Sequence, residues 1–343
     1  MTPDEMYASL KTALGDVVPD VELRIKSELA VQINQLKQEK NAVILGHNYM
    51  EPVLYHSVTD YKGDSLELSR RAAQSDKDII VFCGVKFMAE TAKILNPTRT
   101  VLLPADAGCS LAASITAADV RALKARYPGV PVVTYVNTYA DVKAESDICC
   151  TSGNAVAVVE SLKNETIIFL PDEYLAANVA RETGKHIIYP TLTGPALPES
   201  GLDYQMIGWR GRCEVHDKFT LEDIRSVRAQ FPDVIILAHP ECSPEVVAAS
   251  DFSGSTTAMI RYVEKTNAPR YLILTECSMG DNIAAANPEK NMLRLCSVRC
   301  QYMNQITMEN TLRCLQTERI NIQVPEPVRV RALQAVERMI AIG

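Results

Sequence analysis

The spacing of short β-branched segments constrains the fold of this chain more than any other feature. Apolar runs bounded by polar residues or glycine are typical of strands. They occupy residues 41–45, 78–82 and 100–103, then 130–135, 166–170 and 186–189, then 234–237, 270–274 and 291–295. From the first to the second strand of each unit the offsets are 36, 35 and 36 residues (42 to 78, 131 to 166, 234 to 270). From the second to the third strand they are 22, 20 and 21 (78 to 100, 166 to 186, 270 to 291). Such a recurrence indicates three copies of one unit.

Helical patterns fill the gaps between these strands. They cover residues 66–75, 154–162 and 256–265 in the first gaps, and 87–95, 174–183 and 279–287 in the second. Alternating strands and helices with short connections predict parallel sheets covered by helices. The sequence therefore predicts an α/β protein with three analogous three-layer domains built on short parallel sheets. The expected boundaries are an N-terminal helical arm at 1–40, domains at 41–128, 129–232 and 233–326, and a C-terminal helix at 327–343.

Charge and composition exclude several classes of partner. The chain has 35 basic and 42 acidic side chains, a net charge of −7, which disfavours nucleic acid and anionic membranes. It has no apolar run near the ~18–20 residues that span a bilayer, and its acidic start is unlike a signal peptide. We therefore expect a cytoplasmic protein that binds neither nucleic acid nor membranes. In a reducing compartment, a special cysteine among the ten is more often a metal ligand or a nucleophile than a crosslink.

Polar residues recur directly after the first strand of each unit, where parallel α/β folds bind ligands. They are His47, Asn48 and Tyr49, then Tyr135, Val136 and Asn137, then His239, Pro240 and Glu241. The next helix of each unit starts with small polar residues, at 63–65, 151–153 and 253–256. Such residues cap helices, and the same helix ends also bind anions. Three of them together favour a ligand that carries carboxylate or phosphate.

One cysteine recurs in each unit. Cys109 and Cys300 each lie nine residues beyond the start of a third strand (100 to 109, 291 to 300), and Cys213 follows a longer connection. Three thiolates on a pseudo-threefold axis fit either an iron–sulfur cluster or a zinc ion. Three ligands to a [4Fe–4S] cluster would leave one iron open to act as a Lewis acid on a substrate oxygen. Zinc with three cysteines and an open position is the alternative.

Several motifs resemble the quinolinate synthase family, over about residues 40 to 315. They are Gly46-His47-Asn48-Tyr49, Gly63-Asp64-Ser65, Val85-Lys86-Phe87-Met88-Ala89-Glu90-Thr91-Ala92, Tyr135-Val136-Asn137, Cys149-Cys150-Thr151-Ser152, His239-Pro240-Glu241-Cys242 and Cys300-Gln301-Tyr302-Met303. The resemblance implies three α/β domains around a central [4Fe–4S] cluster, one per chain, held by Cys109, Cys213 and Cys300. It also implies condensation of iminoaspartate with dihydroxyacetone phosphate to quinolinate, phosphate and two waters in NAD biosynthesis. L-aspartate oxidase, which makes iminoaspartate, is then a possible transient partner.

The resemblance also implies roles for individual residues. The substrate-binding set is His47, Ser65, Tyr135, Val136, Asn137, Ser152, His239, Pro240, Glu241 and Thr256, and the acid–base set is Tyr49, His47, His239 and Glu241. Cys296 could compete with Cys300 for the third ligand position or have a redox role, but Met303 and the residues after it favour Cys300. His216 is expected either beside the site or in a structural role.

Two other functions stay open at this point. One is a different Fe–S hydro-lyase that acts on a hydroxy acid. The other is a non-catalytic Fe–S redox or iron sensor. A sensor has no need for so many polar side chains around one cavity, and it usually carries a partner-binding or DNA-binding segment. The sequence has neither a basic helix nor a helix-turn-helix pattern.

Overall fold

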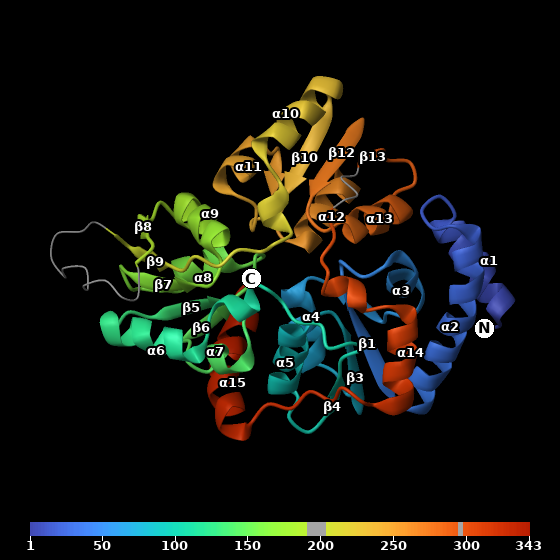
Figure 1. The fold of residues 1–343 in the computed structure, drawn as a ribbon, viewed down its shortest axis with the longest axis horizontal. Helices are drawn as coiled ribbons and strands as arrows, with labels where there is room; N and C mark the ends of the chain where they lie inside the picture. The colour runs from blue at the N-terminus through green and yellow to red at the C-terminus, as the bar shows by residue number, and fades with distance from the viewer. Residues whose placement is uncertain (191–203, 294–297) are drawn as a thin grey trace.

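Three parallel sheets form the framework of the protein (Figure 1). The structure is a computed structural model that describes residues 1–190, 204–293 and 298–343. The first sheet has the order β2 (Tyr61–Gly63), β1 (Ala42–His47), β3 (Ile79–Cys83), β4 (Thr100–Leu102). The second is β6 (Ile148–Cys150), β5 (Val132–Tyr135), β7 (Ile167–Leu170), β9 (Met206–Gly208), β8 (Ile187–Ile188). The third is β11 (Phe252–Ser253), β10 (Val234–Ala238), β12 (Arg270–Leu274), β13 (Met292–Leu293). The predicted α/β class is confirmed.

Helices alternate with the strands in the same order in each unit. The helices of the first unit are α3 (Pro52–Ser57), α4 (Ser65–Ala73) and α5 (Lys86–Leu95). Their counterparts are α7 (Ala140–Lys143), α8 (Ala155–Ser161) and α9 (Glu173–Thr183), then α11 (Pro244–Ala249), α12 (Thr256–Lys265) and α13 (Cys277–Ala286). The helices α4, α8 and α12 each follow a short edge strand. They start at the end of the sheet where the polar residues gather.

Two details of the sheets differ from the sequence prediction. Each sheet gains a short edge strand beside its first strand, β2, β6 or β11, and none of the three was predicted. The predicted third strand of the middle unit, residues 186–189, becomes β8 at the outer edge, while β9 pairs with β7 in its place. The middle unit therefore carries an inserted strand, which explains its longer connection to Cys213.

An aspartate clamps the first strand of each sheet to the edge strand. Asp60, Asp147 and Asp251 lie just before the edge strands. Their carboxylates accept the backbone N–H of Ile44, Val132 and Ile236 at 2.8, 2.8 and 2.7 Å. Each aspartate also donates its own N–H to the carbonyl of the same strand residue. Because the same pair of hydrogen bonds occurs in each sheet, every residue near it has an equivalent residue in the other two units.

Four helices cross from one unit to the next. Residues of α6 (Ala117–Arg126) pack on the second sheet, and α10 (Leu221–Gln230) packs on the third. The helix α14 (Met308–Thr317) returns to the first sheet beside α2 (Asp20–Glu39), and α15 (Glu326–Ile340) packs on β6 and α7, as the red helices of Figure 1 show. The remaining helix, α1 (Pro3–Leu14), packs on α2. The domain boundaries stay a prediction, because these helices bind the units together.

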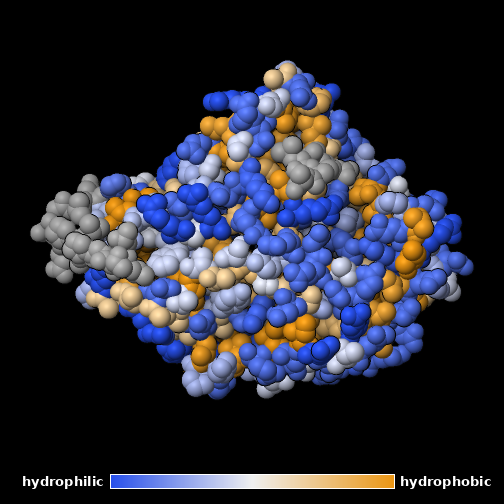
Figure 2. Space-filling model, viewed as in Figure 1, coloured by the Kyte–Doolittle hydropathy of each residue, from blue (hydrophilic) through white to orange (hydrophobic). Residues whose placement is uncertain are grey.

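The visible surface is mainly hydrophilic. On the face in Figure 2 the described residues show orange groups that are scattered among hydrophilic ones. Within the described ranges, no helix is both long enough and apolar enough to cross a membrane.

Candidate active site

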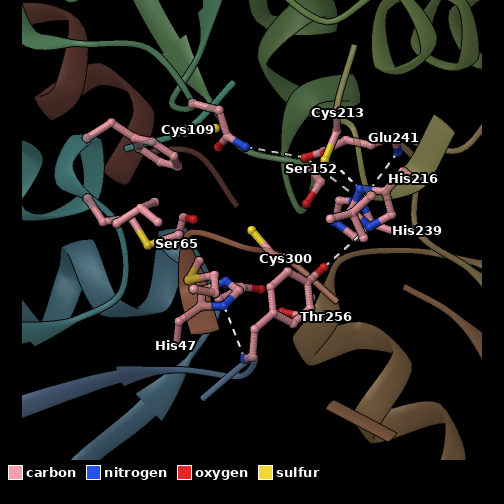
Figure 3. A pocket seen from close by; sticks show the side chains of 18 of the residues that line it. His47, Ser65, Cys109, Ser152, Cys213, His216, His239, Glu241, Thr256 and Cys300 are labelled. Atoms are coloured by element: carbon pink, nitrogen blue, oxygen red, sulfur yellow. Dashed lines mark hydrogen bonds and ion pairs between the residues drawn. The ribbon is translucent and has the colours of Figure 1, made fainter. Parts of the chain in front are cut away.

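A cavity of about 70 Å³ lies where the carboxyl ends of the three sheets meet. Its lining combines three cysteines, hydroxyl and imidazole groups, one carboxamide and carboxylates with an apolar wall. Figure 3 shows side chains from the three sheets pointing into it, with His47 and Ser65 on one side and His216, His239 and Glu241 on another.

Nine predicted site residues occupy three equivalent positions of the repeat. The clamped strand residues are those whose N–H bonds to an aspartate, namely Ile44, Val132 and Ile236. Three residues after each of them come His47, Tyr135 and His239. Five residues after each clamped residue come Tyr49, Asn137 and Glu241. Five residues after the clamping aspartate come Ser65, Ser152 and Thr256. All nine line the cavity. Val136 and Pro240, which are the middle residues of their tripeptides, do not line this cavity.

His47 and His239 make the same bond in two different sheets. The Nδ1 atom of His47 accepts the N–H of Tyr49 at 3.2 Å, and that of His239 accepts the N–H of Glu241 at 3.3 Å. Burial lowers the pKa of His47 to about 4 and that of His239 to about 3. Both rings are therefore neutral at pH 7 and carry their proton on Nε2. Each ring can donate that proton in a hydrogen bond.

Glu241 is the buried anion of the site. Tyr135 donates its hydroxyl hydrogen to Glu241 Oε1, and His216 Nδ1 lies 2.9 Å from Oε2. Burial alone raises the pKa of Glu241, but His216, His239 and the Tyr135 bond outweigh it and hold the pKa below its usual range. Glu241 is therefore ionised, and it orients Tyr135 and His216.

A hydrogen-bonded chain links this anion to Tyr49. His216 Nε2 lies 2.8 Å from Thr275 Oγ1, which lies 2.5 Å from the Tyr49 hydroxyl. Burial, together with the charge of Glu241, raises the pKa of Tyr49 well above its usual value. Tyr49 therefore holds its proton at neutral pH. The chain Tyr49–Thr275–His216–Glu241 can move a proton between the cavity and the buried carboxylate.

Each of the three cysteines starts the same local structure. Cys109, Cys213 and Cys300 are each followed by a 3-10 turn, at Ala112–Ser114, His216–Lys218 and Met303–Gln305. Seven residues after the cysteine, Thr116, Thr220 and Thr307 cap the crossing helices α6, α10 and α14. Backbone N–H groups two and three residues after each cysteine hydrogen-bond its sulfur, for example those of Leu111 and Ala112 at Cys109. The three sulfurs therefore have one environment repeated three times.

Comparison with known proteins decides the family. The family model described as quinolinate synthetase A protein matches residues 31–341. The chain is 53% identical over 311 residues to quinolinate synthase 2 of Mesorhizobium japonicum, covering 90% of each chain. It is 50% identical over 336 residues to quinolinate synthase 1 of the same organism, covering 98% of each chain.

The chain belongs to the quinolinate synthetase A family. A third relative, the quinolinate synthase of Agrobacterium fabrum, is 49% identical over 336 residues, with 98% of this chain and 92% of the relative covered. The family assignment therefore holds for nearly the whole chain, and it confirms the resemblance that the motifs indicated.

The three-cysteine arrangement in this quinolinate synthetase A protein fits a metal cluster. Burial raises the pKa of Cys109 to about 12 and also raises the pKa of Cys213 and Cys300. These thiols therefore need the positive charge of a metal to become thiolates. The N–H groups aimed at each sulfur then stabilise the thiolate.

A second group of potential ligands is Cys213, His216 and Glu241, whose donor atoms lie within 4.8 Å of one another. Both ring nitrogens of His216 already have partners, Glu241 on one side and Thr275 on the other. This pairing favours a role for His216 in the proton chain over metal ligation.

The sequence prediction missed Thr275 and left His216 open. Thr275 follows β12, and His216 lies in the 3-10 turn after Cys213. The pattern Asp-x4-Ser/Thr, which recurs at residues 60, 147 and 251, marks Ser65, Ser152 and Thr256, but it does not mark Thr275 or His216. Cys296 lies outside the described residues. The six other cysteines in the described part of the chain, Cys83, Cys149, Cys150, Cys242, Cys277 and Cys314, are all buried.

Proposed function

We propose that this chain is a quinolinate synthase that condenses iminoaspartate with dihydroxyacetone phosphate to quinolinate, phosphate and two waters. The observation that carries the proposal is the convergence of one cysteine loop from each repeat on the cavity that holds the acid–base groups. In a chain about half identical to curated quinolinate synthases, that arrangement favours a three-cysteine active-site cluster.

In this proposal Cys109, Cys213 and Cys300 hold one [4Fe–4S] cluster per chain. When bound, the cluster supplies an open iron that acts as a Lewis acid on a substrate oxygen. Such a cluster needs a reducing compartment, which supports a cytoplasmic location. The transient contact with L-aspartate oxidase stays a prediction of the resemblance, and co-purification of the two enzymes would test it.

The protein side chains bind the substrates and move protons. Ser65, Ser152 and Thr256 offer hydroxyl donors to carboxylate and phosphate oxygens, and His47 and His239 add their Nε2 protons. Asn137 Oδ1 is buried without a hydrogen-bond partner among the described residues, so it is available to an N–H group of iminoaspartate. Tyr49 donates a proton to a leaving oxygen, and the tyrosinate that remains recovers a proton through Thr275 from His216, which in turn takes up one that the substrate releases.

Anaerobic purification with iron and sulfide quantitation, combined with a quinolinate assay, tests the proposal. We expect brown protein with about four irons and four sulfides per chain that forms quinolinate from the two substrates. Cys109→Ala, Cys213→Ala and Cys300→Ala should each lose the cluster and the activity, and Cys314→Ala is the matched control. Brown protein without turnover would indicate a sensor, and colourless active protein would indicate zinc.

Tyr49→Phe tests the acid–base assignment. The variant should retain its iron and lose most of its turnover, because the ring remains while the proton donor is removed. Full turnover with an intact cluster would remove Tyr49 from the acid–base role.

A further inference from the structure

Hydrogen bonds join the first and third sheets directly beside the cavity. The bonds are made by residues that flank the site residues in the sequence. These are Asn48, Asp64, Ser255 and Thr257. Asn48 lies between His47 and Tyr49, Asp64 precedes Ser65, and the other two lie on either side of Thr256. The neighbours of the substrate-facing groups therefore control how the two sheets meet.

Four bonds link Asn48 and Asp64 to residues 255–257 of the third unit, and two of them end on one hydroxyl. Asn48 Nδ2 donates to Thr256 Oγ1 at 2.9 Å and to Thr257 Oγ1 at 3.3 Å. The backbone N–H of Asp64 also donates to Thr257 Oγ1, at 3.2 Å. Ser255 Oγ donates to Asp64 Oδ2 at 2.8 Å. Thr257 is the only one of these residues that bonds to both loops of the first sheet.

The first-sheet side of the interface is held firmly. Asn48 is 2% exposed, and its Oδ1 accepts the Tyr55 hydroxyl at 3.2 Å. Its carbonyl also accepts Asn282 Nδ2 at 3.2 Å, and Asn282 lies on α13 of the third unit, so Asn48 is held from both sides. Buried, satisfied amide networks of this kind allow one arrangement of their members. A change at Thr257 is therefore transmitted to the loops and is not absorbed by rotation of Asn48.

We propose that Thr257 is a positioning residue that sets the width of the substrate cavity. Its hydroxyl fixes the distance between the two loops that carry His47, Tyr49 and Ser65 and the helix α12 that carries Thr256. Thr257 does not itself line the cavity. It acts through Asn48 and through the backbone of Asp64, so its role differs from that of the substrate-facing Thr256.

Hydrogen exchange tests the link without reference to the reaction. Thr257→Val removes the hydroxyl and keeps the shape, and Thr257→Ser restores the hydroxyl. We expect the Asp64 amide to exchange about tenfold faster in Thr257→Val and at the wild-type rate in Thr257→Ser. Thr12→Val, at a threonine that bonds its own helix on α1, is the matched control. Unchanged exchange in Thr257→Val would overturn the proposal.

Steady-state kinetics of the cluster-loaded enzyme tests the effect on the cavity, and this part rests on the proposed function. Thr257→Val should raise KM by about tenfold with kcat within about twofold, because substrate contacts from two sheets are misplaced together. Thr257→Ser should match the wild type, and iron content should stay constant in all variants. A fall in kcat with unchanged KM would indicate loss of folded enzyme and would contradict the positioning role.

A second variant guards against misfolding of the first. Asp64→Ser keeps a side-chain cap for α4 but is too short to accept from Ser255. Because Asp64 also lines the cavity, its readout is hydrogen exchange and not KM. The Ala258 amide, which donates to Ser255 Oγ, should exchange faster in this variant. If the wild-type enzyme formed no quinolinate, the proposed function would fail, while the exchange of the Asp64 amide would still decide whether Thr257 holds the interface.

Discussion

His47 and His239 are buried at equivalent positions, and the same two causes give both rings the same protonation state. The backbone N–H of the residue two positions later in the chain donates a hydrogen bond to Nδ1, and burial disfavours the charged ring. Their role as donors through Nε2 therefore follows from the local backbone after the strand. The sequence could predict which residues lie there, because polar residues after parallel strands are informative, but the tautomer required the geometry of the loop.

The low pKa of His47 predicts how the free energy of unfolding depends on pH. The folded-state pKa of about 4 lies below the ordinary value of 6.5, so the unfolded chain binds more protons between these values. The stabilisation is complete above pH 6.5 and is lost as the pH falls toward 4. In His47→Asn, whose Oδ1 can still accept from Tyr49, the loss of unfolding free energy from pH 7 to pH 5 should be smaller by roughly 2 kcal/mol. Denaturant unfolding under anaerobic conditions measures it, and identical pH slopes in the two proteins would contradict it.

Thr275 makes a prediction about turnover. Its hydroxyl gives the short route between Tyr49 and His216, at 2.5 and 2.8 Å, whereas the direct contact between the Tyr49 hydroxyl and His216 Nε2 is 3.5 Å, so Thr275→Val should lower kcat about 10- to 100-fold. Thr275→Ser should keep most of the activity. Quinolinate formation at saturating substrate measures the effect. A Thr275→Val enzyme with normal kcat would show that protons reach Tyr49 by another route.

At the scale of elements, the sequence predicted the central strands and the long helices and missed the edge strands. β1, β3 and β12 are buried apolar runs whose signal is strong. β2 and β11 are only three and two residues long and contain Lys62 and Ser253, so no local pattern distinguishes them from loops. They exist because an aspartate clamp and a neighbouring strand hold them, and both are tertiary interactions.

The clamps predict equal sensitivity in the three units. Asp147→Ala leaves the Val132 N–H without its carboxylate partner, which should cost about 1–3 kcal/mol of unfolding free energy. Asp16→Ala, at an exposed position on the surface, should change it little. Chemical denaturation measures both. A similar loss in Asp60→Ala and Asp251→Ala would support the equivalence, and a loss at one position alone would contradict it.

At the scale of the whole molecule, the spacing of the strands predicted three units, but it could not predict how they interlock. Each cysteine loop leads into a helix that covers the following sheet, and the last of them, α14, returns to the first sheet. The sequence pattern of an amphipathic helix does not indicate which sheet the helix will cover. The expected boundaries at 128, 232 and 326 therefore place α6, α10 and α14 with the preceding unit, while their packing is with the next.

The end of α15 makes a prediction at this scale. Arg70 on α4 donates to the carbonyls of Ile340, Ile342 and Gly343 at 2.8 to 3.3 Å. Lysine cannot reproduce this forked geometry, so Arg70→Lys should lower the unfolding free energy by about 1–2 kcal/mol. Arg71→Lys is the control, because Arg71 makes an exposed ion pair with Glu67 and lies over the Tyr61 ring but does not bond the end of α15.

Thermal unfolding and carboxypeptidase digestion measure the two variants. Arg70→Lys should melt earlier and release its last residues faster than Arg71→Lys does. Equal behaviour of the two variants would show that the carbonyl contacts do not hold the C-terminal segment.

The return of α14 to the first sheet also means that the first unit is completed only late in synthesis of the chain. The strands of that sheet are complete at residue 102, but Met308, Leu312 and Leu315 of α14, which pack against α2 and β3, are translated only after two further units. At ~5–20 residues per second, ribosomes need about 10–40 s to make the intervening stretch. During that interval a nascent chain has a folded sheet with part of its apolar surface open to water. We therefore expect ribosome-bound chains to recruit chaperones until α14 (Met308–Thr317) emerges.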